Sequence, residues 1–557
     1  MKISKVRYRI SMVLTLLSLS IWIIGCEEPD FTIMSDTDPT PDQTAEGDWV
    51  AFLNQLDVES SIIVPNESSI QDAVDAAEPG DAIYIEPGKY DEQVTVDNSN
   101  IQLIGLSGEN GEAVTITNLS GIQASNNVEI VNIQHPDLIE KSTNSFRRMP
   151  NKRRRLLSMN RSKLQNGIAH YQFVVDLGSD EFDVVRIHRV VRERRPYRPT
   201  RTDGAVFMIH GSGQNFDDIF LRPGVDQPDA QNSSPFYLAS NNIDVWGIDL
   251  AWTLVPEETN DFTFMQDWGV ERDVDHTLKA MAIARLVRGL TRQGFDRMNL
   301  LGFSYGVSVA YAAAGRETQQ HRILRDIKGI VAADGFMKYA PEDEAFRISS
   351  CDRAAAAQEQ INNGVYQNSN GIFFRGIGDL AVIKPEEPSA TIPWLNNYQA
   401  ALFLGIAPPA NPPAPSWHFI GGELRGNPPI PGGLLYTKSS RWIQLLRGLP
   451  PYQPRANGRD TNVCACNEEE VTIDDHLIEI TVPILYLGVA GGFGQQGLYT
   501  SSLTSSTDIT DHIVSLRPQS RAIDYGHADL FMGEDAAELA WDVLLEWLVD
   551  HSHRLRA

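Results

Sequence analysis

From about residue 166 to the C-terminus, short apolar runs of strand length alternate with longer segments of helical spacing. Amphipathic helices are predicted over 273–292 and 534–549. The apolar runs that predict strands are 171–175, 184–191, 205–209, 245–248, 298–302, 327–333, 484–487 and 521–524. Two opening strands followed by a strand–helix repeat favour an α/β fold, in which a mostly parallel sheet is covered by helices on both faces.

The strand–helix repeat is interrupted between about residues 335 and 481. The interruption contains a proline-rich stretch at 408–413. It also contains aromatic residues spaced along its length, namely Phe373, Trp394, Tyr398, Phe403, Trp417 and Phe419. Because a segment with this apolar content can bury surface of its own, we predict an ordered cap rather than a long loop.

Residues 60–137 have a different pattern, with short alternating runs separated by Gly- and Asn-rich turns. A predicted helix over 68–77 precedes a run that ends in Pro87-Gly88-Lys89-Tyr90. This order resembles the opening of a right-handed parallel β-helix of the pectate-lyase-like and pectin-methylesterase-like group. The resemblance implies a short β-helix-like domain of about three coils and carries over no catalytic residue. A small β-sandwich-like domain is the alternative.

The first 25 residues have the pattern of an export signal. Four basic residues precede an apolar run over 10–25, which is short for a membrane span and ends at Cys26. The sequence Ile23-Ile24-Gly25-Cys26 resembles a bacterial lipobox, which implies cleavage before Cys26 and lipid attachment to its sulfur. Glu27 after the cysteine resembles the enteric signal for the outer membrane, so we expect an exported protein anchored to the cell envelope by lipid. An uncleaved anchor helix is the alternative.

Two segments of opposite charge follow this signal. Residues 26–50 are acidic and contain no lysine or arginine, which predicts a disordered tether. Residues 138–165 are basic and contain Arg153-Arg154-Arg155, which predicts a linker between domains; docking against the acidic remainder or anionic envelope material is the alternative. The chain of 557 residues has 47 basic and 73 acidic side chains and a formal charge of −26, which argues against general binding to nucleic acids.

A nucleophile motif lies between a predicted strand and a helix. Gly302-Phe303-Ser304-Tyr305-Gly306 follows the apolar run 298–302. A catalytic serine needs a hydroxyl held out on a tight strand-to-helix turn, and the two glycines remove side chains that would block that turn. We therefore expect Ser304 to be the nucleophile.

A second motif lies upstream, where an apolar run ends in His210-Gly211-Ser212-Gly213. With the serine motif and the late histidine His527, in this chain order, it resembles the α/β-hydrolase superfamily in its capped, lipase- and esterase-like form. The resemblance covers 166–553 and implies a mostly parallel eight-stranded sheet with a cap at about 335–481. It also implies that Ser212 or Gly213, together with Tyr305, donates backbone N–H groups to the oxyanion. His210 precedes the serine and is expected to be a structural residue.

The base and the acid come from the same resemblance. His527 lies between the last predicted strand and the last helix, where the family has its base. No carboxylate stands in the sequence 487–492, where the family often has its acid, so we choose Asp334 at the end of the preceding strand. Asp508 and Asp511 remain rivals.

The cysteines predict one disulfide in the cap. With Cys26 lipidated, Cys351 is expected to pair with Cys464 or Cys466, which leaves one thiol. No His, Cys or Asp cluster has the spacing of a metal site, so we expect neither a metal nor a cofactor.

These observations predict a serine hydrolase that cleaves a small-molecule or lipid ester at the cell envelope, with contact to envelope polysaccharide through the β-helix-like domain. The alternative is a non-catalytic lipoprotein for adhesion or glycan binding, built on a degenerate hydrolase fold. The best support for this alternative is that no carboxylate follows the seventh predicted strand.

Overall fold

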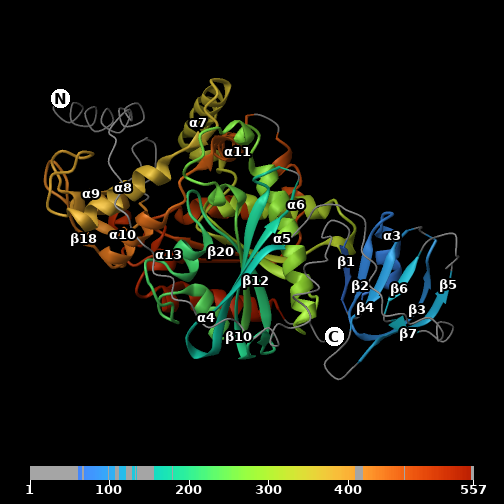
Figure 1. Ribbon diagram of the computed structural model, residues 1–557. Helices are drawn as coiled ribbons and strands as arrows, with labels where there is room; N and C mark the ends of the chain where they lie inside the picture. The colour runs from blue at the N-terminus through green and yellow to red at the C-terminus, as the bar shows by residue number, and fades with distance from the viewer. Residues whose placement is uncertain are drawn as a thin grey trace.

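The computed structural model describes residues 61–65, 68–97, 100–106, 112–120, 128–131, 133–134, 156–178, 180–407, 418–468 and 471–552 (Figure 1). Cys26, the export signal, the acidic tether and most of the basic linker lie outside these residues. Within them, no helix is both long enough and apolar enough to cross a bilayer.

A ten-stranded sheet forms the centre of the molecule. Six neighbouring strands are parallel and run in the order β21 (Ile509–Val514), β20 (Ile484–Val489), β15 (Ile327–Ala333), β14 (Met298–Phe303), β12 (Gly204–Ile209) and β13 (Ile243–Asp249). The sheet continues antiparallel through β10 (Val184–Arg195), β9 (Ile168–Asp176) and β8 (Leu156–Lys163), and the short β11 (Arg198–Pro199) pairs with β10. This mixed, mostly parallel sheet is the central sheet of the α/β-hydrolase fold that the sequence predicts.

Helices cover both faces because the side chains of the central strands alternate between two apolar cores. On β12, Phe207 and Ile209 belong to the core that includes α5 (Val270–Leu290) and α6 (Tyr305–Thr318). Val206 and Met208 belong to the opposite core, which includes α4 (Ser234–Ser240) and α14 (Asp542–Asp550). Strands buried on both faces read as continuous apolar runs, and this is why they are visible in the sequence.

The predicted sheet is wrong at both of its edges. The last strand is β21, whereas the predicted strand 521–524 is a 3-10 helix over Arg521–Ile523. β21 escaped notice because it is an edge strand with exposed polar residues, Asp511 among them. Residues 156–163, assigned to the basic linker, form β8 at the other edge, so the sheet has two strands more than the eight expected.

The described residues of the insertion between β15 and β20, namely 334–407, 418–468 and 471–483, are largely helical. Its helices are α7 (Glu344–Asn362), α8 (Asn370–Ile383), α9 (Asn397–Ile406), α10 (Ser439–Gly448) and α11 (Arg455–Cys466). Two short ribbons complete it, β16 (Gln367–Asn368) with β19 (Gln453–Pro454) and β17 (Gly422–Arg425) with β18 (Ile430–Leu434). A disulfide joins Cys351 on α7 to Cys466 on α11, and Cys464 is a buried thiol. We refer to this insertion as the cap.

The N-terminal part consists of a short helix, α3 (Ile70–Ala76), and two parallel sheets. One sheet has the order β1 (Ser61–Val64), β2 (Ala82–Ile85), β4 (Gln102–Gly105) and β6 (Glu129–Val131). The other contains β3 (Gly88–Thr95), β5 (Val114–Ser120) and β7 (Ile133–Gln134). After β1 the chain passes back and forth between the two sheets, and Ile83, Val94 and Leu103 lie in the core that they share.

This N-terminal part packs beside the large domain, next to α5 (Figure 1). The side chains of Ile63, Tyr84 and Ile104 belong to the same apolar core as α5. Because strand side chains alternate, β1, β2 and β4 present these residues outward and Ile62, Ile83 and Leu103 inward.

Candidate active site

Ser304 lies on a sharp turn between β14 and α6. Its backbone has φ 54° and ψ −115°, a conformation that costs energy for a residue with a Cβ atom and that marks functional sites when the surroundings enforce it. A Cβ atom at Gly302 would lie 2.1 Å from the carbonyl oxygen of Gly306, and one at Gly306 would lie 2.5 Å from that of Ile209. Both glycines of the motif are therefore required by close backbone approach, as the sequence predicts.

Asp334 lies next to the serine because β14 and β15 end together. Phe303 and Ala333 are partners in the parallel register, so Ser304 and Asp334 leave the sheet at the same edge. The Ser304 N–H donates to the Ala333 carbonyl oxygen at 3.0 Å, and the Asp334 N–H donates to that of Leu487 at 2.8 Å. Neighbouring parallel strands thus place Ser304 and Asp334 together at their carboxyl ends.

His527 contacts Asp334 directly. The distance between His527 Nδ1 and Asp334 Oδ2 is 2.7 Å, and both side chains are buried. With Nδ1 as the donor, the neutral imidazole has Nε2 as its basic nitrogen. The ring stacks against Phe303, the residue before the serine, with 4.6 Å between the ring centroids, so it lies beside the serine turn.

The loop after β20 holds the Asp334 carboxylate. Val489 N–H donates to Oδ1 at 3.0 Å and Phe493 N–H donates to Oδ2 at 3.2 Å. These two hydrogen bonds fix the orientation of the carboxylate. Backbone N–H groups at the end of β20 and in this loop thus donate to the carboxylate of Asp334, which follows the neighbouring strand β15.

Neither rival acid contacts His527. Asp508 Oδ2 lies 3.1 Å from His551 Nε2, and Asp511 is exposed on the edge strand β21. Among the three candidates that the sequence left open, Asp334 is the one paired with the histidine.

The residues chosen as oxyanion donors flank Ser304. Tyr305 is the first residue of α6, so its N–H has no partner within the helix. A Cβ atom at Gly211 would lie 3.0 Å from that of Ser304, which places the loop containing Ser212 and Gly213 against the serine. An anion at this point would also meet the positive end of the 14-residue helix α6.

His210 supports this loop from behind. Its Nδ1 lies 2.9 Å from the carbonyl oxygen of Gly211, and the Leu250 N–H donates to its Nε2 at 3.3 Å. Burial lowers the pKa of His210, which favours the neutral ring that these contacts need. These contacts agree with the structural role that the sequence predicts for His210.

Three supporting residues were missed by sequence reasoning. Arg521 donates to the carbonyl oxygens of Ala490 and Gly492, both at 2.7 Å, and so braces the loop that holds Asp334. A Cβ atom at Gly492 would lie 2.0 Å from Asp334 Oδ2, so this position must be glycine. Asp273 on α5 accepts from the Tyr305 hydroxyl at 2.6 Å. None is part of a local motif, and only the contacts reveal them.

A cavity of about 520 Å³ lies between the oxyanion loop and the cap. Ser212 and Gly213 line one side of it. The apolar part of its lining comes from α8, α9, α10 and the segments beside them, and includes Phe374, Leu404, Phe419, Trp442, Leu446 and Leu449. The centroid of the Phe419 ring is also 6.1 Å from that of the His527 ring, which connects the cavity to the His527–Asp334 pair.

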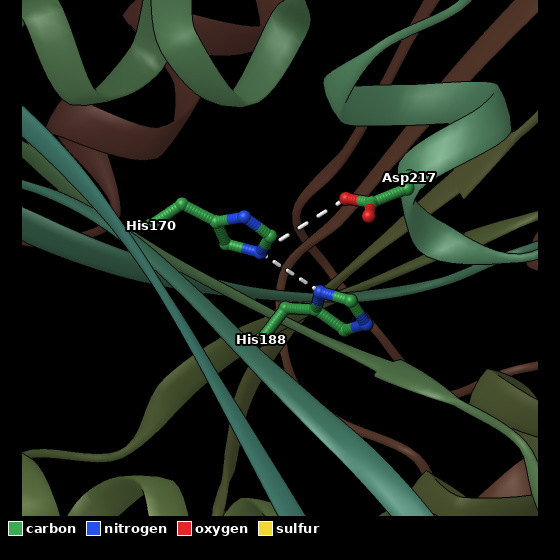
Figure 2. A group of neighbouring side chains, drawn as sticks. All are labelled: His170, His188 and Asp217. Carbon is green, nitrogen blue, oxygen red and sulfur yellow. Dashed lines mark hydrogen bonds and ion pairs between the residues drawn. The ribbon is translucent and has the colours of Figure 1, made fainter. Parts of the chain in front are cut away.

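A separate polar cluster consists of the buried His170 on β9 and His188 on β10 and the half-buried Asp217 (Figure 2). His170 Nε2 lies 3.0 Å from His188 Nδ1 and 4.0 Å from Asp217 Oδ1. His188 Nε2 lies 3.1 Å from Asp249 Oδ2. Ligand atoms of the first three residues lie within 4.8 Å of one another, an arrangement that sequence spacing does not reveal because they come from three elements. The 3.0 Å contact between His170 and His188 is a hydrogen bond, whereas His188 Nε2 lies at ion-pair distance from Asp249 and has no hydrogen-bond partner among the described residues.

No family model matches the chain, and no curated protein matches it. Solved structures similar to it include a protein from Sulfolobus solfataricus, 19% identical, covering 71% of this chain and 99% of that chain with a TM-score of 0.48. A soluble variant of monoglyceride lipase from Saccharomyces cerevisiae is 12% identical, covering 73% of this chain and 99% of that chain with a TM-score of 0.36. A monoacylglycerol lipase from Paleococcus ferrophilus is 14% identical, covering 64% of this chain and 97% of that chain with a TM-score of 0.33. The sheet order and the serine turn carry the assignment: the chain has the α/β-hydrolase fold.

Proposed function

We propose that the protein is a serine hydrolase of the carboxylesterase or lipase type. The observation that carries the proposal is the buried His527–Asp334 pair beside the strained serine turn. Strain, an oriented imidazole and an acid held by backbone N–H groups together form the arrangement that activates a serine.

In this mechanism Ser304 Oγ attacks the ester carbonyl carbon and His527 Nε2 takes its proton. Asp334 stabilises the imidazolium, while the N–H groups of Tyr305 and of Ser212 or Gly213 donate to the oxyanion. Collapse of the tetrahedral intermediate breaks the C–O bond, and His527 returns the proton to the leaving alcohol. Water then attacks the acyl-serine with the same base, which releases the acid and restores Ser304.

The cavity under the cap supports an ester with an apolar chain as the substrate class. Its aromatic and leucine side chains offer an apolar chain a site removed from water. A lipid ester or another small ester with an acyl chain fits this lining.

The cell envelope is the proposed location. The lipobox-like sequence ending in Cys26 supports export, cleavage and lipid attachment, with the acidic tether as a spacer. The N-terminal parallel sheets support a short β-helix-like domain that contacts envelope polysaccharide. A Cys26→Ser variant should lose metabolic labelling by palmitate and leave the membrane fraction; unchanged labelling would contradict the proposal.

The non-catalytic alternative depended on the absence of an acid after the seventh strand. The contact between Asp334 and His527 favours the catalytic proposal over it, because a degenerate site has no need to maintain a buried, hydrogen-bonded histidine–aspartate pair.

Reaction with a fluorophosphonate probe tests the proposal. We expect labelling of the protein but not of its Ser304→Ala variant, which should also lose hydrolysis of short p-nitrophenyl esters and keep its melting temperature. Ser502→Ala, at an exposed serine of α12 (Leu498–Ser502), is the matched control and should behave as the parent. Ester hydrolysis that persists in Ser304→Ala would overturn the proposal.

A further inference from the structure

The two helices that the disulfide joins, α7 and α11, lie near each other (Figure 1), and residues of both form one wall of the cavity. On α7 the lining residues are Arg353, Ala356, Ala357 and Gln360, which have the spacing of one helix face. On α11 they are Arg455, Gly458 and Asn462, again on one face. The Cys351–Cys466 bond fixes these two faces relative to each other.

This wall is cationic in a strongly acidic protein. The chain has 73 acidic side chains against 47 basic ones, yet none of the described residues lining the cavity is an aspartate or a glutamate. Among the described residues that line the cavity, the two with charged side chains are Arg353 and Arg455. A site of this kind attracts an anion, since both arginines line the same cavity.

Arg455 lacks a counter-charge within the part of the chain that the structure describes. Its Nε atom is buried and has no hydrogen-bond partner there. Burial lowers its pKa, and no acidic group opposes that effect. By contrast Arg459, one helical turn further along α11, is paired with Asp460 and bonded to Gln358. A half-buried guanidinium left unpaired is costly for folding, and a bound anion would satisfy it.

Arg455 lines the same cavity as Ser212 and Gly213 of the oxyanion loop. It is the first residue of the 12-residue helix α11, whose positive end adds to its charge. Gln453, two residues before it, has its Nε2 atom 3.4 Å from Ser212 Oγ on the oxyanion loop. The apolar side chains of α8 and α10 line the same cavity.

We propose that this cavity binds an amphiphilic ester that has an anionic group, a carboxylate or a phosphate, beside its apolar chain, with Arg455 as the main anion ligand and Arg353 as the second. The proposal rests on the proposed esterase function for its chemistry, and it adds the charge of the substrate. An arginine pairs with either oxyanion through two parallel N–H donors, so both groups share the same recognition chemistry.

Kinetics with matched esters test the proposal and distinguish the two positions of the anion. Mono-p-nitrophenyl adipate against p-nitrophenyl hexanoate tests a carboxylate on the acyl side. A lysophosphatidic acid against the monoacylglycerol of the same chain tests a phosphate on the alcohol side. We expect the protein to favour the anionic member of at least one pair. The Arg455→Gln variant should then raise KM for that member about tenfold or more and leave the neutral ester unchanged.

The controls use the same helix and the same charge. Arg459→Gln removes a cation from α11 outside the cavity and should not alter the preference. Arg455→Lys should restore part of it, because it returns the charge without the planar fork. Equal use of the anionic and neutral esters, or an equal loss for both in Arg455→Gln, would overturn the proposal.

A binding measurement separates failure of this proposal from failure of the esterase function. Calorimetry on the Ser304→Ala variant needs no turnover and compares dodecyl phosphate with the neutral 1-O-dodecylglycerol. Tighter binding of the phosphate that is lost when Arg455→Gln is added supports the anion site even if no ester is cleaved. Equal binding of the two ligands overturns it.

Discussion

The Nδ1 atom of His527 lies 2.7 Å from Oδ2 of Asp334, although 193 residues separate them in the chain. The contact forms because Asp334 directly follows β15, and the chain returns after β21 to the same edge of the sheet. The loop after β20 completes the arrangement by donating backbone N–H groups to the carboxylate. The acid is therefore held by three segments that are distant in sequence.

Replacement of the acid should abolish most of the activity. Asp334→Asn removes the charge that orients and stabilises the imidazole, and we expect kcat for an ester substrate to fall about 10³- to 10⁴-fold. Asp511→Asn, at the exposed rival on β21, should leave kcat unchanged. Steady-state kinetics of both variants decide between the two acids, and the opposite result would refute the assignment of Asp334.

Gly492→Ala should disturb the acid without touching any catalytic side chain. The added methyl group would lie 2.0 Å from Asp334 Oδ2, so the carboxylate or the loop must move. We expect kcat to fall by about tenfold to a hundredfold, because catalytic geometry tolerates shifts of much less than 1 Å. Gly376→Ala is the control, since a Cβ atom at this exposed position of α8 meets no heavy atom within 4 Å. A Gly492→Ala variant with parental kcat would show that the carboxylate is not held as described.

The buried side chain of His170 should make the free energy of unfolding depend on pH. Burial holds the pKa of His170 well below its ordinary value, and the neighbouring His188, Arg222 and Arg186 lower this pKa further while Asp249 opposes them. The unfolded state therefore binds a proton below about pH 6.5 that the native state does not, so stability falls as the pH is lowered. For one proton the slope is at most about 1.4 kcal/mol per pH unit.

Denaturant unfolding at pH 5, 6 and 7 measures this slope. His170→Gln keeps a donor at the position of Nε2 but does not titrate, so the free energy of unfolding should depend less on pH in this variant. His476→Gln, at a partly exposed histidine, should retain the parental slope. A slope that is the same in all three proteins would contradict the low pKa of His170.

The disulfide should stabilise the cap and leave Cys464 as the protected thiol. The bond between Cys351 and Cys466 spans 115 residues, and loss of a native disulfide costs about 2–5 kcal/mol in small secreted domains. We expect the double variant Cys351→Ala/Cys466→Ala to unfold at lower denaturant, whereas Cys464→Ala should keep the bond. Burial raises the pKa of the Cys464 thiol, so iodoacetamide should modify it only after unfolding. Peptide mapping that finds Cys464 alkylated in the native protein would contradict its burial.

The sequence by itself determined the fold class and most of the serine site. Strands buried on both faces, such as β12 and β14, appear as apolar runs, and the glycines around Ser304 report a turn whose geometry is local. His527 was identifiable from its place before the last helix. These features depend on residues close together in the chain, and periodicity and turn chemistry record such features directly.

Only the tertiary structure decided which carboxylate meets His527, which cysteine pairs with Cys351, and how Arg455 faces the cavity. Each depends on which strands and helices become neighbours, and a contact across 193 residues leaves no periodic trace in the sequence. The edge strands β8 and β21 were missed for a related reason: exposed polar residues fit an edge, which needs only backbone pairing on one side. Interactions between residues close in sequence determine where the helices and strands form. Packing between distant helices and strands determines which side chains meet at the candidate site.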